Sequence, residues 1–206
     1  MNDYSFLLAI AGVLFVGAMS PGPSFLVVAQ NSLSKSRSHG LVTALGTGLG
    51  VAIFAVLASL GITTLIAAMP TVYILFKIAG GVYLLYLAWK IWGGAQQPLA
   101  RSENASSTNN SLFKSFIMGL ATQTSNPKTA LVIAGIFAAF MPSEPPENTT
   151  LLIALIAFTI DFSWYALVAL TLSSARSKSI YIRAKTNFDR VAAVFLGVVG
   201  VRLLVS

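Results

Sequence analysis

Three charged side chains lie inside long apolar stretches and away from their ends, and their types define the chemistry available there. Asp161 lies at the centre of one stretch, Lys128 near the middle of a second and Lys77 a short way into a third. A carboxylate at the centre of a membrane helix costs about 2.5–3.5 kcal/mol, so Asp161 needs a proton or a cationic partner. Two interpretations follow. Asp161 binds an ammonium group or a transported proton while the lysines place a carboxylate, or it forms an internal pair with a lysine that only joins two helices.

Two proline motifs interrupt apolar runs that are longer than the roughly 20 residues a straight span requires. Ser20-Pro-Gly-Pro-Ser24 interrupts the first run, and Asn126-Pro-Lys-Thr129 interrupts the fourth. Helices often begin with a polar cap followed by proline, so a second half-helix is expected to start at Pro21 and at Pro127. Each new N-terminus presents backbone N–H groups and about half a positive charge, which suits a carboxylate. The candidate binding residues are Ser20, Pro21, Gly22, Pro23, Ser24, Lys77, Asn126, Pro127, Lys128, Thr129 and Asp161, and Asp161 is also the candidate proton carrier.

The elements that must position these residues are membrane helices. Of the 206 residues, 56% are hydrophobic and only 9% are charged, a composition that belongs in lipid. Six apolar runs are long enough to span a bilayer, at about 5–32, 41–67, 70–92, 113–140, 150–174 and 187–205. The first run is too long for a signal peptide and lacks a basic start, so we interpret it as a mature span. One transmembrane domain, residues 1–206, accounts for the chain.

The six runs divide into two halves that repeat the same interrupted helix. Repeat 1 covers about 1–95, a polar linker covers 96–111, and repeat 2 covers about 112–206. Three spans per half give the halves opposite topology, so the sequence predicts an all-α fold of two inverted three-helix repeats. A weaker similarity links Phe76–Ala79 with Asp189–Ala192. Interrupted helices persist in lipid only where protein or a cavity covers their backbone, so the two breaks predict a substrate cavity.

The basic residues indicate orientation and not a nucleic-acid partner, although the net charge is +7. They gather in alternate connections, the ones holding Lys35, Lys90 to Lys114 and Arg176 to Arg190, whereas the opposite connections carry only acids. By the positive-inside rule these basic connections are cytoplasmic and both termini are periplasmic. His39 is expected as a solvated loop residue in the first of them. With no cysteine in the chain, disulfides and thiolate metal sites are excluded.

Glycines in the second run predict close helix packing. Gly46 and Gly50 are four residues apart, the spacing of a helix-packing face in membranes, and no strand precedes them as a dinucleotide loop would require. Glycines on the second and sixth spans also leave faces that could pair two protomers. A homodimer is therefore expected.

In these motifs the chain resembles the LysE/RhtB family of amino-acid exporters. The matching segments, in order and spacing, are Ser20–Pro23, the glycine-rich second span, Lys77–Leu84, Ser125–Lys128 and Asp161–Tyr165. The resemblance implies export of a neutral amino acid, such as homoserine, threonine or leucine, or of a derivative, from a bacterial cytoplasm. It further implies exchange for protons at the inner membrane, with no cofactor.

Two other functions deserve comparison with this one. An exporter of a metal or other inorganic ion on a related scaffold would need clustered His, Cys, Asp or Glu ligands, and the apolar runs offer one central Asp. A membrane-embedded enzyme would need several acid, base or metal-binding groups at one interface. The sequence therefore favours a transporter over an enzyme.

Overall fold

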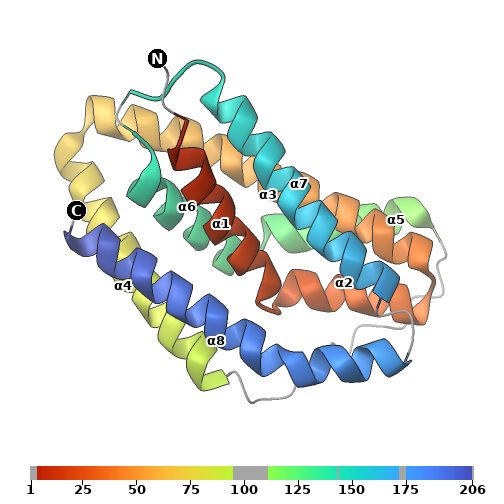
Figure 1. The fold of residues 1–206 in the computed structure, drawn as a ribbon. Coiled ribbons are helices and arrows are strands. Elements are labelled where there is room, and N and C mark those ends of the chain that lie inside the picture. The colour runs from red at the N-terminus through yellow and green to blue at the C-terminus, as the bar shows by residue number, and fades with distance from the viewer. Residues whose placement is uncertain (1–3, 95–110, 143, 172–174, 206) are drawn as a thin grey trace.

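The computed structural model describes residues 4–94, 111–142, 144–171 and 175–205. These residues form eight α-helices (Figure 1), and no β-strand is found among them. The helices are α1 (Phe6–Met19), α2 (Pro23–Ser34), α3 (Arg37–Ala68), α4 (Pro70–Gly94), α5 (Leu112–Thr124), α6 (Pro127–Phe140), α7 (Thr149–Thr171) and α8 (Ala175–Val205). The all-α prediction is confirmed, and most of the predicted linker 96–111 lies outside the described residues.

Several helices are long and apolar enough to cross a membrane. They are α3 over Arg37–Gly61, α4 over Thr71–Gly94 and α7 over Thr149–Thr171. The pair α1 and α2 qualifies together as one span bent by 55°, and α6 is a shorter apolar helix. By length and composition the described residues thus supply three spans, or four with the bent pair, as a multi-pass membrane protein requires.

The first predicted helix break is present, but its register differs from the expectation. Ser20 and Gly22 both have extended backbone, with ψ angles of 117° and −165°. The residue before a proline is disfavoured in the α region, so Pro21 and Pro23 each force the preceding residue out of the helix. The new helix therefore begins at Pro23 with Gly22 as its N-cap, not at Pro21. Ser20 ends α1 instead of capping α2.

The second break matches the expectation in detail. α5 ends at Thr124 and α6 begins at Pro127, with Asn126 in extended backbone as the N-cap. The Asn126 side-chain oxygen accepts a hydrogen bond from the backbone N–H of Lys128 at 3.1 Å. One of the orphan donors of the new helix is thereby satisfied within the cap itself.

The helices pack as two groups with α1 and α6 between them (Figure 1). In one group α3 runs along both α5 and α7, and in the other α4 runs along α8. Both α1 and α6 contact members of each group. The two interrupted helices consequently meet in the middle of the molecule.

Glycines allow the close approach of α3 and α5. A Cβ atom on Gly46 would clash with the Phe116 carbonyl oxygen and lie 2.7 Å from the Leu120 backbone nitrogen. The predicted packing face is therefore confirmed, and it is used inside the chain. Gly200 of α8 also packs internally, because a Cβ there would lie 3.0 Å from the Gly81 carbonyl oxygen of α4. Gly46 and Gly200 thus pack within the chain, and the homodimer stays a prediction.

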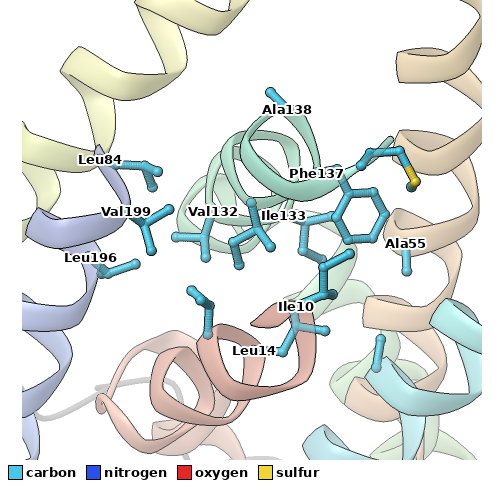
Figure 2. Close-up of a cluster of buried hydrophobic side chains, with 14 of the residues drawn as sticks. Ile10, Leu14, Ala55, Leu84, Val132, Ile133, Phe137, Ala138, Leu196 and Val199 are labelled. Atoms are coloured by element: carbon cyan, nitrogen blue, oxygen red, sulfur yellow. The ribbon is translucent and has the colours of Figure 1, made fainter. Parts of the chain in front are cut away.

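An apolar core lies where α1 and α6 meet the surrounding helices (Figure 2). Ile10 and Leu14 of α1 face Val132 and Ile133 of α6, and side chains from α3, α4 and α8 surround them. The labelled members are Ile10, Leu14, Ala55, Leu84, Val132, Ile133, Phe137, Ala138, Leu196 and Val199. This core fixes the two interrupted helices relative to each other.

Two basic segments that were predicted as loops are helical. α3 begins at Arg37 and α8 begins at Ala175, each before the apolar run that marked its span. Lys and Arg are good helix formers, so hydropathy locates the edge of the bilayer and not the end of the helix. The solvated-loop expectation for His39 is wrong, because this residue lies in the first turn of α3, is 8% exposed and contacts the Ser36 hydroxyl at 2.8 Å through Nδ1.

Candidate functional site

A cavity lies between the two helix breaks and the middle of α7. It leaves about 50 Å³ to the centres of water molecules, enough for a few of them at about 10–15 Å³ each. Its lining residues come from α1, α3, α5, α6, α7 and both breaks. They are Leu14, Gly17, Ala18, Ser20, Gly22, Val51, Gln123, Asn126, Lys128, Thr129, Val132, Ile133, Ala157, Ile160, Asp161 and Tyr165.

Asp161 supplies the carboxylate of the cavity and is only 4% exposed. Its Oδ1 accepts a hydrogen bond from Gln123 Nε2 at 3.2 Å. Its Oδ2 is buried without a hydrogen-bond partner among the described residues. Thr47 of α3 lies beside the carboxylate, but its hydroxyl donates to the Ala44 carbonyl oxygen at 2.9 Å. A buried acceptor without a donor is costly, so this oxygen suits a proton or a cationic group of an occupant.

A chain of hydrogen bonds connects Asp161 to both helix breaks. Gln123 Oε1 accepts a hydrogen bond from the Ser24 hydroxyl in the first turn of α2. Asn126 Nδ2 donates in turn to the Ser24 oxygen at 3.4 Å. Gln123 can donate and accept at once because it is an amide, so it joins the acid on α7 to the start of each half-helix. The two breaks are therefore coupled directly through side chains.

Lys128 supplies the cation of the cavity and reaches across to the first break. Its Nζ donates to the Ser20 carbonyl oxygen at 3.1 Å, and its side chain passes beside Gly22. The carbonyl of Ser20 has lost its helical partner at the break, so the ammonium satisfies an orphan acceptor. Lys128 and Asp161 thus bond to Ser20 and Gln123, respectively, and not to each other. The alternative of an internal pair between Asp161 and Lys128 is not what the structure shows.

The remaining wall of the cavity is apolar. Leu14 and Gly17 of α1 face Val132 and Ile133 of α6, and Ile160 of α7 completes this side. The absence of a side chain at Gly17 leaves a small space in this wall, because a Cβ there would lie at ordinary contact distance, 3.8 Å, from Val132 Cγ1. The cavity therefore has an acid, a lysine and an apolar surface in its lining.

The structure brings most of the predicted site residues together, and leaves some outside the cavity. Ser20, Gly22, Asn126, Lys128, Thr129 and Asp161 line it. Ser24 lies just behind as part of the hydrogen-bond chain, whereas Pro21, Pro23 and Pro127 shape the backbone from outside the lining. Lys77 is half-buried on α4 and does not line the cavity.

Sequence reasoning missed three polar residues of the site. Gln123 and Tyr165 line the cavity, and Asp189 of α8 accepts a hydrogen bond from the Ser20 hydroxyl at 3.3 Å. Gln123 precedes the second break by three residues, so its polarity inside an apolar run was a usable signal. The similarity between Phe76–Ala79 and Asp189–Ala192 pointed at Asp189 but did not indicate its burial.

The chain has apolar helices, a break between α1 and α2 and another between α5 and α6, and a polar cavity between these breaks. This combination is typical of membrane transport proteins. Within that class the chain belongs to the LysE-type translocator family, whose model matches residues 15–206. The resemblance inferred from the motifs is thereby confirmed.

Curated relatives cover nearly the whole chain. The threonine efflux protein of Escherichia coli strain K12 is 28% identical over 200 residues, covering 97% of each chain. The threonine efflux protein of Salmonella typhi is also 28% identical, covering 96% of each chain. An uncharacterized E. coli K12 membrane protein, YahN, is 29% identical over 94% of this chain and 86% of its own. No solved structure matches the chain.

Proposed function

We propose that the chain exports a neutral, zwitterionic amino acid across the bacterial cytoplasmic membrane in exchange for protons. The observation that carries this proposal is that the acid and the lysine of the cavity are bonded to other groups and not to each other. Asp161 has an oxygen without a donor, while Lys128 is held apart on Ser20. An α-amino acid carries both complementary groups, an ammonium for Asp161 and a carboxylate for Lys128.

The class of substrate follows from the cavity wall and from the relatives. The apolar side is small, because Leu14, Val132 and Ile133 close around the open position at Gly17. Such a wall fits a short side chain and offers no second acid for a dibasic substrate. Two of the relatives are named threonine efflux proteins, so threonine is the first substrate to test. The cavity must widen to admit it, since the present space holds only a few waters.

Proton exchange follows from competition at one carboxylate. Asp161 can hold either a proton or the substrate ammonium, and the two exclude each other on Oδ2. A proton that arrives from the periplasm displaces the ammonium, and the amino acid leaves on that side. The proton is released when the site faces the cytoplasm and a new ammonium binds.

We further propose the arrangement of six spans as two inverted repeats, with both termini in the periplasm. The pairs α1/α2 and α5/α6 form the interrupted spans, and α3, α4, α7 and α8 form the others. The two helix breaks support this arrangement, and so does the helix packing. α3 packs on α7, and α4 packs on α8. A two-fold axis between the halves would exchange the two helices of each of these pairs. The basic segments then lie on the cytoplasmic side.

Reconstitution tests the function. The purified protein in liposomes with an acidic lumen should concentrate radiolabelled threonine, and a protonophore should release it. Empty liposomes provide the background, and arginine with its second cation serves as a substrate control. If threonine accumulates to the same level without a pH difference, proton exchange is refuted. If the protein transports none of the neutral amino acids, the substrate class is refuted.

A further inference from the structure

A second buried carboxylate lies behind the first helix break, outside the cavity lining. Asp189 of α8 is 4% exposed, and the Ser20 hydroxyl that donates to it is 2% exposed. The same serine accepts Lys128 Nζ on its carbonyl oxygen at 3.1 Å. Ser20 therefore joins the acid of α8 to the lysine of α6 through two hydrogen bonds.

The charges show which acid balances the lysine. Asp189 is close enough to Lys128 for their charges to attract, whereas Asp161 is bonded to the neutral Gln123. Arg190, next to Asp189 in the chain, stacks on the Trp92 ring at 5.6 Å and so points elsewhere. The ammonium in the cavity wall thus has its opposite charge behind the break and not across the cavity.

We propose that Asp189 is a positioning residue for the carboxylate of the substrate, and this inference rests on the proposed function. An ammonium buried without an opposite charge is strongly disfavoured relative to the neutral amine. The negative charge of Asp189 attracts the ammonium of Lys128, and the Ser20 carbonyl oxygen holds the lysine at the wall next to Gly22. The lysine ammonium is therefore in place before the substrate binds. Transport then requires a substrate that has a free carboxylate.

Substitution of Asp189 by Asn isolates the charge. An asparagine keeps the shape and still accepts the Ser20 hydroxyl through its amide oxygen. The measurement compares the KM for threonine with that for threonine carboxamide, which lacks the carboxylate, in liposomes with an acidic lumen. D189N should raise the KM for threonine by about tenfold or more, because the substrate carboxylate then loses its bond to a charged Lys128. The maximal rate and the KM for the carboxamide should change little.

Two further variants separate positioning from folding. D189E retains the charge and should restore most of the preference for threonine over its carboxamide, while Glu144→Gln, at an exposed acid, should leave both KM values unchanged. If D189N does not reach the membrane, Ser20→Ala removes the bridging hydroxyl and should weaken the same preference.

Three results would overturn the inference. The first is equal export of threonine and its carboxamide by the wild-type protein. The second is a D189N protein that keeps both the preference and the KM of the wild type. The third is a D189N protein that keeps both and loses only the response to the pH difference, which would make Asp189 a proton carrier. A wild-type protein that transports no amino acid would instead refute the proposed function.

Discussion

Replacement of Gly50 by alanine should disturb the cavity through Gln123, although Gly50 itself is not one of the lining residues. A Cβ on Gly50 would lie 2.7 Å from Cβ and 3.0 Å from Cγ of Gln123. Carbon atoms pack at about 3.5–4.0 Å, so the glutamine must move by about 1 Å. Its Nε2 is already 3.2 Å from Asp161 Oδ1, and a shift of that size breaks the bond. The acid then loses its hydrogen-bond donor as well as its connection to the breaks.

The expected cost has two parts that different assays report. Overpacking of the α3 and α5 interface costs about 1–3 kcal/mol, which lowers the melting temperature of the purified protein. Loss of the amide donor shifts the pH dependence of threonine transport in liposomes, because the carboxylate loses a bond that favours its charged form. Gly12→Ala is the matched control, since a Cβ there meets nothing within 4 Å. A Gly50→Ala protein with the melting temperature and pH profile of Gly12→Ala would refute this reasoning.

Three further outcomes follow from the packing, the cap and the topology. Gly46→Ala should destabilise the protein more than Gly50→Ala does, because its new methyl group meets backbone atoms of α5 that cannot rotate away; thermal melting measures this, and equal melting temperatures would contradict it. Asn126→Ala should lower stability by about 0.5–2 kcal/mol through loss of the α6 cap, and an unchanged unfolding midpoint would argue against a capping role. An impermeant thiol reagent applied to intact cells should label Glu144→Cys but not Ser38→Cys; the reverse pattern would invert the proposed topology.

The helix breaks were predictable because proline and its neighbours act locally. Asn126-Pro127 gave the correct cap and the correct first residue of α6. At the first break two prolines compete, and the helix can restart only at the second, Pro23, because each one excludes its predecessor from the α region. The prediction considered Pro21 alone, so it located the break correctly but placed the start of the new helix two residues too early.

The acids of the site were less predictable, because their partners come from distant parts of the chain. Asp161 stood out as a carboxylate within an apolar run. Asp189 did not, since it lies beside Arg190 at the very start of the run 187–205, next to the basic residues of the preceding connection. Only the packing of α8 on α1 buries Asp189 against Ser20 and so gives Lys128 a counter-charge other than Asp161. Local patterns indicated the ionised groups, and tertiary contacts decided how they pair.

The central claim is that Asp161 exchanges a proton for the substrate ammonium, and Asp161→Asn tests it most directly. The asparagine retains the shape and a hydrogen-bond acceptor for Gln123 but cannot titrate. With the membrane potential held at zero, a one-for-one exchange in wild-type liposomes should concentrate threonine about tenfold for each unit of pH difference. Asp161→Asn, shown by its melting curve to be folded, should give no accumulation at any pH difference. Liposomes of this variant that still concentrate threonine against a gradient would contradict the account and assign the coupling to another group.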